Sequence, residues 1–324
     1  MAPALIDPAL AGRFADDLTP LWKDGGKLGL AVSGGPDSLA LLLLGAAALP
    51  GRVEAATVDH QLRAESAAEA AAVAAVCASL GVPHRTLQVD VAPGNVQSEA
   101  RSARYTALAG WAAAQNLNAL ATAHHADDQA ETLLLRLNRA SGVAGLAGTR
   151  AKGFIPGAAL PLLRPLLGWR KEELAAIVTA AGIAPAQDPS NADDRFDRAR
   201  LRKALAEADW LDVPAVAASA AHLADADAAL DWAARREWSE CVSVEGLGLT
   251  YSPQAPRAIA LRVLARIVVH LGGEEPRGGA VARLFDALVE GRTTSIGHLV
   301  ARPGLDGWTF TKAPARRVSP RSGA

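Results

Sequence analysis

Four short polar segments carry the side chains whose types and spacing could do chemistry: "SGGPDS" (33–38), "VDHQLR" (58–63), "VQSEARSARY" (96–105) and "HHADDQAET" (124–132). In the first, two glycines leave backbone N–H groups open to an anion, and the helix that follows points its positive end at the same place. A GxxxxGK[ST] phosphate loop is excluded, because both its spacing and its lysine are missing. A carboxylate, Asp37, stands there instead and would repel phosphate, so we expect a bridging Mg²⁺. The alternative is a tight strand-to-helix turn capped by Ser33 or Asp37.

Each polar segment follows an apolar run typical of a buried strand, and a helical pattern comes after it. Strands that alternate with helices predict βαβ units and a parallel sheet, and therefore an α/β fold. Ligands of such sheets bind beyond the carboxyl ends of the strands, where the polar segments would converge. The expected strand–helix pairs are 27–33 with 37–49, 52–60 with 65–81, 83–91 with 98–116, and 117–125 with 127–141.

The length of 324 residues predicts two domains, since single cores rarely grow past about 250 residues. We place the boundary near residue 210, with a catalytic domain at 1–210 and a smaller, mainly helical domain at 211–324. An alanine-rich connecting helix (214–238) opens the second domain and could serve as a homodimer interface or as a packed connector. The tail after residue 310 contains four basic residues and no acid, which suits either contact with a phosphate backbone or a solubilising end.

Composition narrows the class of protein. The formal net charge of −1 excludes a polycation, so any nucleic acid must bind through local patches. Cys77 and Cys241 are far apart, which argues against a zinc ribbon, an iron–sulfur ligand set or a disulfide framework and fits a reducing cytosol. No signal-peptide pattern opens the chain, and the longest uncharged run (38–51) is shorter than the roughly 20 residues of a membrane span. We therefore expect a cytoplasmic protein that binds no membrane.

Taken together, these segments resemble a known family. "SGGPDS" is similar to the PP-loop of the N-type ATP pyrophosphatases, which cleave ATP between the α and β phosphates and adenylate an acceptor. Within that superfamily, most of residues 27–205 resembles the tRNA(Ile)-lysidine synthetases. The resemblance rests on "VDHQLR", "EARSARYTAL" (99–108), "HHADDQAETLLLRLNRASGVAGLAG" (124–148) and "DPSNADDRFDRARLR" (188–202).

The resemblance implies a fold and a reaction. The fold is a parallel-sheet PP-loop ATP pyrophosphatase domain, similar to the adenine nucleotide α-hydrolases, and the enzyme is a ligase that forms a carbon–nitrogen bond. ATP and Mg²⁺ adenylate C2 of the wobble cytidine in the CAU anticodon of isoleucine tRNA, and the ε-amine of free L-lysine then displaces AMP. The second domain is implied to help select the tRNA. Longer members carry a further C-terminal domain, which we do not expect here.

The same resemblance assigns roles to single residues. The ATP-binding candidates are Ser33, Gly34, Gly35, Pro36, Asp37 and Ser38. The catalytic candidates are Asp37, Asp128, Asn191 and Arg202, of which Asp37 and Asp128 would hold Mg²⁺. The lysine-binding candidates are Glu131, which lies one helical turn beyond Asp128, and Arg104. The candidates that would face tRNA are His60, Arg63, Arg198 and Arg200.

Purely structural explanations of some of these residues also fit the sequence. Adjacent Asp127 and Asp128 are also ordinary helix N-caps, and "DDRFDRARLR" is also typical of an exposed, salt-bridged helix. The pair His124–His125 does not predict a zinc site, because no cysteine lies nearby. Ala199 stands where the family commonly has Asn, a departure from the family pattern.

Other functions fit less of the sequence. A tRNA thiolase usually needs catalytic cysteines or a cluster, and neither cysteine is suitably placed. An amidotransferase would need a glutaminase domain, and an NAD synthetase would not explain the segment at 188–202. A non-catalytic tRNA-binding protein predicts loss of the metal carboxylates, yet Asp37 and Asp128 are both present.

Overall fold

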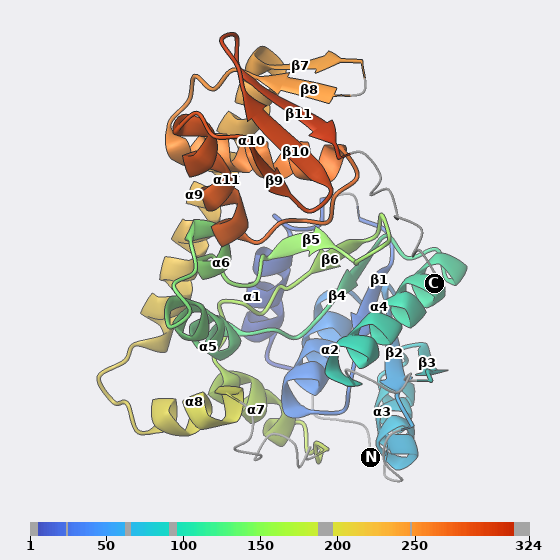
Figure 1. The fold of residues 1–324 in the computed structure, drawn as a ribbon. Coiled ribbons are helices and arrows are strands. Elements are labelled where there is room, and N and C mark those ends of the chain that lie inside the picture. Colours follow the sequence, from blue (N-terminus) through green and yellow to red (C-terminus); the bar gives the residue numbers. More distant parts are fainter. Residues whose placement is uncertain are drawn as a thin grey trace, which may run out of the picture. The chain divides into compact units, whose positions relative to one another are not determined.

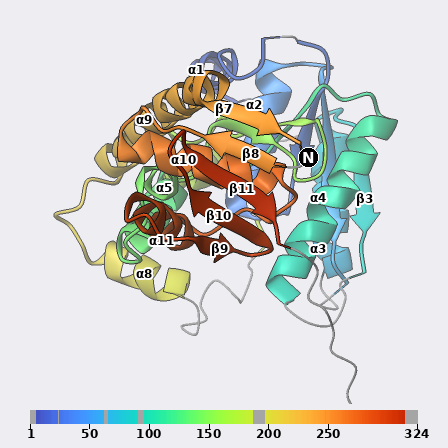
Figure 2. The same ribbon diagram turned by 45° about the horizontal axis from the view of Figure 1, so that its top comes forward.

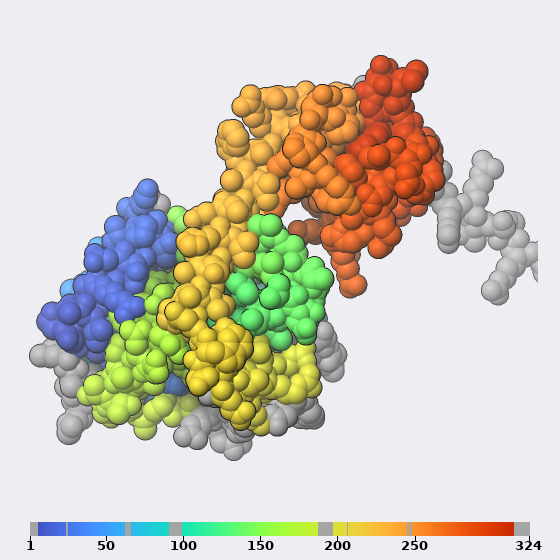
Figure 3. Space-filling model, turned by 90° about the vertical axis from the view of Figure 1, so that its left-hand side faces the viewer, coloured from blue at the N-terminus to red at the C-terminus, as the bar shows by residue number. Residues whose placement is uncertain are grey.

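The computed structural model describes residues 6–23, 25–61, 66–90, 96–186, 197–246 and 248–313. The chain forms two compact units, Met1–Ala224 and Asp225–Ala324. The division falls inside helix α9 (Val213–Cys241), which Figure 3 shows as an unbroken yellow-orange column. Among the helices in the described ranges, none is long and apolar enough for a membrane crossing.

A six-stranded sheet in the order β3-β2-β1-β4-β6-β5 forms the centre of the first unit (Figure 1). Its parallel strands are β1 (Leu28–Ala31), β2 (Val53–Asp59), β3 (His84–Gln88), β4 (Ala119–Ala121) and β6 (Pro161–Leu163), and β5 (Lys152–Phe154) pairs antiparallel with β6. The helices that follow the first four strands are α2 (Pro36–Ala48), α3 (Ser66–Ser79), α4 (Val96–Ala114) and α5 (Ala126–Leu137). The predicted parallel α/β sheet is confirmed.

The edges of this sheet differ from the expectation. β3 was predicted as a buried strand, but its residues are half-buried or exposed, because it pairs only with β2 at one edge. β5 and β6 form the other edge, within the glycine-rich stretch that follows α5 and the short helix α6 (Val143–Leu146). Short strands between glycines and prolines give no periodic signal, so the sequence did not predict these two.

Helices pack on both faces of the sheet, because alternate strand residues point to opposite sides. Leu28 and Leu30 of β1 belong to a core shared with α1 (Pro8–Leu18), α2 and α7 (Lys171–Ala180). On the opposite face, Ala56 and Leu120 pack with Leu108 and Trp111 of α4. The strongly apolar sequence of α2 is explained by its place in the first core, where it contacts both α1 and α7.

Gly29 of β1 allows α4 to pack close to the sheet. A Cβ added there would lie 2.9 Å from Leu117 Cδ1 and 3.0 Å from Trp111 Cζ3. We therefore expect Gly29→Ala to destabilise the first unit by about 1–3 kcal/mol through overpacking, measured by chemical denaturation. Gly110→Ala in α4 is the matched control: its added Cβ would meet nothing within 4 Å, so stability should stay equal or rise. Equal stability of both variants would contradict the packing argument.

The second unit is mainly helical, as predicted, and also contains a five-stranded antiparallel sheet. Beyond the division in α9, its helices are α10 (Arg257–His270) and α11 (Gly278–Val289). Figure 2 shows its strands side by side in the order β7 (Val242–Glu245), β8 (Gly248–Tyr251), β11 (Trp308–Lys312), β10 (Leu299–Pro303) and β9 (Thr294–Ile296). The sequences at 293–302 and 307–313 are typical of strands, whereas the hairpin of β7 and β8 directly follows a long helical pattern. The helices and the sheet share one core that includes Val263, Leu284 and Phe310.

A buried carboxylate connects α9 to β8 and to the loop before α10 in the second unit. Glu237 is 7% exposed, and its Oε1 accepts hydrogen bonds from the Tyr251 hydroxyl at 3.1 Å and from the Gln254 and Ala255 N–H groups at 2.8 and 3.0 Å. Burial would raise the pKa of Glu237, but the backbone hydrogen bonds outweigh it and lower that pKa below its ordinary 4.5.

The depressed pKa predicts how stability depends on pH. The ionised carboxylate of Glu237 is favoured in the folded state. Its contribution to the free energy of unfolding is therefore fully present above pH 4.5 and is lost as the pH falls through the pKa of the folded state. We expect Glu237→Gln to lower the free energy of unfolding by about 1–3 kcal/mol at pH 7 and by less at pH 3. Amide hydrogen exchange in β8 and α10 would report the cost within this unit. A penalty that stays constant from pH 7 to pH 3 would contradict the argument.

Candidate active site

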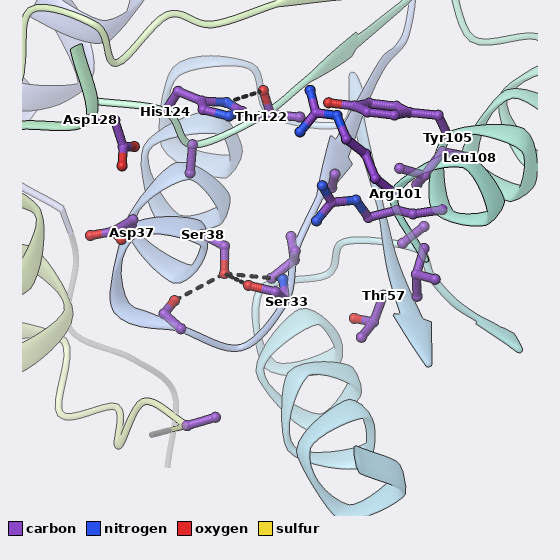
Figure 4. A pocket seen from close by; sticks show the side chains of 18 of the residues that line it. Ser33, Asp37, Ser38, Thr57, Arg101, Tyr105, Leu108, Thr122, His124 and Asp128 are labelled. Atoms are coloured by element: carbon purple, nitrogen blue, oxygen red, sulfur yellow. Dashed lines mark hydrogen bonds between the residues drawn. The ribbon is translucent and has the colours of Figure 1, made fainter. Parts of the chain in front are cut away.

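A cavity of about 910 Å³ opens in the first unit at the carboxyl ends of β1, β2 and β4. This is the position expected for a ligand site in a parallel sheet. Figure 4 shows Asp37 and Asp128 on one side of the cavity, and Arg101 and Tyr105 reaching in from the other. The candidate residues that line it are Ser33, Gly35, Pro36, Asp37, Ser38, His60, Arg104, Asp128 and Arg198.

The loop at 33–38 leads from β1 into α2 as a bare backbone turn. Gly34 has φ +89°, a conformation that favours glycine, and its carbonyl accepts the Ala186 N–H at 2.9 Å. A Cβ added at Gly35 would meet no protein atom closer than 3.8 Å, so packing within the protein does not require glycine there. Space left beside an open backbone at a helix N-terminus suits a phosphate group.

Serine hydroxyls hold this loop in shape. Ser38 is 6% exposed; its hydroxyl donates to the Gly35 carbonyl at 2.9 Å and accepts the Ser33 N–H at 3.1 Å (Figure 4). The two hydroxyl oxygens are 3.2 Å apart. The network explains why serines flank the glycines, and it orders the loop before any ligand arrives.

His125 lies between the two carboxylates on one side of the cavity. Its Nε2 lies 3.5 Å from Asp37 Oδ2 and 3.6 Å from Asp128 Oδ2, and its backbone N–H donates to Asp128 Oδ2 at 3.2 Å. Burial lowers the pKa of His125, but hydrogen bonds to Asp127 and Asp37 outweigh this effect and raise the pKa to about 10. The sequence did not predict this contact, because residues 37 and 125 meet only in the folded sheet.

Asp127 has a different function from its neighbour. Its Oδ2 accepts the Lys171 N–H at 2.8 Å, and its carboxylate pairs with Arg170 at 3.3 Å. Burial would raise the pKa of Asp127, but hydrogen bonds from His125, Lys171 and Arg170 lower it well below its ordinary value. The carboxylate therefore fastens the start of α5 to the start of α7 and leaves Asp128 to face the cavity.

Glu131 is buried beneath this turn and pairs with Arg202 of α8 (Asp197–Ala206). It is 3% exposed, and its Oε1 accepts the Arg202 Nε–H at 2.6 Å. The other oxygen, Oε2, has no hydrogen-bond partner among the described residues. Arg202 also lies 3.7 Å from Asp128. Arg202 thus connects α8 to the "HHADDQAET" turn, a pairing that the sequence did not reveal.

His60 and Arg104 lie toward the basic side of the cavity. Burial and the nearby Arg104 guanidinium lower the pKa of His60, so its imidazole is neutral at physiological pH. Its neighbour Asp59 accepts the Gln61 N–H at 2.9 Å and the Ser66 hydroxyl at 2.7 Å, which fixes the end of β2.

The remaining candidates are placed as follows. Arg200 pairs with Asp197 at 2.6 Å on the exposed side of α8, away from the cavity lining. Ala199, the departure from the family pattern, is 5% exposed. Arg63 and Asn191 lie outside the described residues. Thr57 and Thr122 also line the cavity but belong to no motif, so the sequence did not predict them. Tyr105 lines the cavity as well; it lies in the segment at 96–105 but was given no role.

The donor set around Asp37 fits a divalent cation. Asp37 Oδ1 is buried without a hydrogen-bond partner among the described residues, and Asp37 and Asp128 contact the same imidazole nitrogen. In the described ranges no group of three or more His, Cys, Asp or Glu could hold a metal ion. Two carboxylates together with substrate phosphate oxygens are a ligand set that suits Mg²⁺, which usually keeps several waters.

Comparison with known proteins identifies the family. Residues 9–209 match the PP-loop domain family. A tRNA(Ile)-lysidine synthase from Novosphingobium aromaticivorans is 49% identical to this chain over 315 residues, which cover 96% of each chain. A tRNA(Ile)-lysidine synthase from Zymomonas mobilis is 40% identical over 320 residues, which cover 97% of this chain and 94% of the relative. The solved structure of the U34-tRNA thiolase NcsA from Methanococcus maripaludis aligns with a TM-score of 0.52 at 15% identity, over 66% of this chain and 76% of that one, which shows the fold alone. The chain belongs to the PP-loop family of tRNA(Ile)-lysidine synthases.

Proposed function

We propose that the cavity adenylates the C2 oxygen of the wobble cytidine in the CAU anticodon of an isoleucine tRNA and then joins free L-lysine to C2. One observation carries the proposal: the PP-loop, the Asp128 turn and the arginines of α4 line one cavity, in a chain 49% identical to a tRNA(Ile)-lysidine synthase. ATP, Mg²⁺ and L-lysine are part of the proposal, as is selection of the tRNA by the second unit. A homodimer through α9 stays a prediction.

In the first step the cytidine C2 oxygen attacks the α-phosphorus of ATP, and pyrophosphate leaves. Negative charge builds on the α-phosphate and on the bridging oxygen, so fixed positive charge and backbone donors matter more than a protein nucleophile. The open backbone at Gly35 would hold the leaving pyrophosphate, and Arg202 would face the phosphates. Asp37 and Asp128 would hold Mg²⁺, which supplies charge neutralisation.

In the second step the lysine ε-amine attacks C2, the bond from C2 to the adenylate oxygen breaks, and AMP leaves. Glu131 Oε2 is a buried carboxylate oxygen without a partner in the described structure; it would accept a hydrogen bond from the lysine ammonium and take the proton that frees the amine to attack. Arg104, across the cavity, would receive the lysine carboxylate. A carboxylate at one end and an arginine at the other suit a free amino acid with a cationic side chain.

The experiment uses an unmodified isoleucine tRNA transcript with a CAU anticodon, ATP, Mg²⁺ and labelled lysine. We expect label in the tRNA and one AMP released for each lysine incorporated. AMP release without incorporation would overturn the proposed acceptor or nucleophile. A transcript with another anticodon is the control and should give neither signal.

The cysteines do not support thiolation. Cys77 is buried in α3, and burial raises the pKa of its thiol to about 12, so it is not a nucleophilic thiolate at neutral pH. Cys241 lies in the second unit, at the end of α9, and neither cysteine is among the cavity-lining residues.

A further inference from the structure

The first turn of α5, which carries Asp128, is held by the chain at the start of α7. The Ala126 N–H donates to the Trp169 carbonyl at 2.9 Å, and Asp127 Oδ2 accepts the Lys171 N–H at 2.8 Å. The first N–H groups of a helix have no partner within the helix, so the contacts made there decide how its first turn is placed. Because Asp128 follows directly in the same turn, the chain at the start of α7 determines where its carboxylate lies.

This part of the chain is in turn fixed by the side chain of Trp169. The indole is fully buried in the core that α1, α2 and α7 share, and its Nε1–H donates to Asp17 Oδ2 of α1 at 2.8 Å. A buried indole N–H needs an acceptor, so this hydrogen bond fixes the ring in one orientation. The ring and the carbonyl that receives the Ala126 N–H belong to one residue, and Trp169 therefore connects α1 directly to the start of α5.

A second residue of α1 holds the same place. Arg13 lies one helical turn before Asp17, on the same face of α1. Its guanidinium carbon is 3.9 Å from the centroid of the Trp169 ring, and its Nη2 donates to the Gly168 carbonyl at 3.0 Å. Its Nη1 donates to Glu173 Oε1 of α7 at 2.8 Å. The indole is thus held by a hydrogen bond at its nitrogen and by a cation over its ring.

The residues of this connection are not among those that line the cavity: Arg13, Asp17 and Trp169. They touch no reacting group, so they can affect the reaction only by placing a residue that does. That residue is Asp128, whose Oδ2 lies 3.6 Å from His125 Nε2, while Asp37 Oδ2 lies 3.5 Å from the same nitrogen. A shift of the start of α5 therefore changes the distance between the two carboxylates that face the cavity.

We propose that Asp17 is a positioning residue for Asp128. By holding the Trp169 indole it fixes the carbonyl that receives the Ala126 N–H, and the first turn of α5 then presents Asp128 beside Asp37. Loss of the hydrogen bond leaves the turn folded but free to shift, and a misplacement of about 1 Å can slow a reaction about a hundredfold. The inference rests on the proposed function for its kinetic consequence only, since the contacts themselves involve no substrate.

Amide hydrogen exchange on the full chain, without ATP, Mg²⁺ or tRNA, tests the connection itself. Asp17→Ala removes the acceptor of the indole N–H. We expect the Ala126 and Lys171 amides to exchange about two- to tenfold faster in this variant, which corresponds to the loss of one hydrogen bond. Asp17→Asn is the conservative variant: its amide oxygen still accepts the indole N–H, so exchange should stay within about twofold of the wild type.

Pyrophosphate release with tRNA present tests the consequence in the active site. The rate is expressed per folded molecule, so that a loss of stability alone does not change it. Asp17→Ala should lower kcat about tenfold and raise the Mg²⁺ concentration needed for half the maximal rate. The affinity for lysine, measured by calorimetry, should change less than about twofold, because Glu131 is held separately by Arg202. Asp17→Asn should recover most of the rate.

Trp169→Phe is the second variant. It keeps an aromatic ring in the core, removes the Nε1–H and should reproduce both effects. Combined with Asp17→Ala it should add little, because each change removes the same hydrogen bond. If Trp169→Phe does not fold, the two variants at position 17 decide the question alone.

Lys27→Gln is the matched control. It breaks the ion pair with Glu54, whose atoms are 2.8 Å apart, just before β1 and at the end of the sheet opposite to the cavity. The change lowers stability in the same unit, because Glu54 is buried and loses its partner. Exchange at the start of α5 and the rate per folded molecule should both stay at the wild-type value.

The outcomes separate this inference from the proposed function. Unchanged exchange at the start of α5 in Asp17→Ala, or a loss in Asp17→Asn as large as in Asp17→Ala, would overturn the positioning role. Faster exchange with an unchanged rate and Mg²⁺ dependence would overturn it as well. A wild-type protein that releases no pyrophosphate with the isoleucine tRNA, while the exchange differences are as expected, would overturn the proposed function and leave the connection from α1 to α5 standing.

Discussion

Asp37→Asn is expected to slow tRNA-dependent ATP cleavage by about a hundred- to a thousandfold, the usual cost of removing one preorganised electrostatic group from an active site. Asparagine keeps the shape of the side chain and removes its charge, so the loop held by Ser33 and Ser38 should persist. Asp37 Oδ1 is buried without a partner in the described structure, and in our proposal it binds Mg²⁺. Asp128→Asn should show a loss of the same order while its amide oxygen still accepts the His125 N–H.

The measurement is pyrophosphate release with tRNA present, followed as a function of Mg²⁺ concentration. Both variants should need more Mg²⁺ than the wild type. Asp7→Asn is the matched control: Asp7 caps α1 through a hydrogen bond to the Ala9 N–H, which asparagine can also accept, and it lies outside the cavity lining. A variant at position 37 or 128 with wild-type Mg²⁺ dependence would refute the metal assignment.

A substitution of Glu131 is expected to have the second large effect, on lysine incorporation rather than on ATP cleavage. Glu131→Gln removes the carboxylate proposed to hold the lysine ammonium, so lysine incorporation should fall by about ten- to a hundredfold at low lysine. Release of pyrophosphate in the adenylation step should fall much less. Separate assays of pyrophosphate release and lysine incorporation on the same variant distinguish the two steps.

The same variant also tests the buried ion pair. Glu131→Gln removes the ion pair with Arg202, whose Nε lies 2.6 Å from Glu131 Oε1, and should lower the free energy of unfolding by about 2 kcal/mol, since Arg202 is one-third exposed and partly solvated. The double variant with Arg202→Gln should lose less stability than the sum of the two single variants, because each single variant already removes the ion pair between Glu131 and Arg202. Strict additivity in denaturant unfolding would show that the two side chains are not coupled.

The regular part of the fold could be predicted from the sequence because its signals are local. β1 and α2 follow from one apolar run, a glycine turn and a second apolar run, and the strands before α3 and α5 follow from the same pattern. The placement of candidates at strand ends also followed, since parallel strands gather their carboxyl ends at one edge. The hairpin of β7 and β8 was missed, because "CVSVEGLGLTY" directly continues a long helical pattern.

The partners of the site residues could not be predicted, because they depend on distant contacts. The sequence shows that Asp127 and Asp128 are adjacent, but not that one binds Arg170 while the other faces the cavity. It shows Glu131 on a helix, but not that Arg202 from α8 meets it.

The attachment of Asp127 to α7 also has a consequence for how the chain is made. The Ala126 N–H donates to the Trp169 carbonyl at 2.9 Å, and the Asp127 carboxylate binds Arg170 and Lys171, so the start of α5 is fixed by residues about 40 positions further along the chain. A chain leaving the ribosome presents β1 and α2 well before these residues appear. The serine hydrogen bonds of the phosphate turn can therefore form early in synthesis. Its hydrogen bond to Ala186 and the final shape of the turn that carries Asp128 are completed only after α7 has emerged.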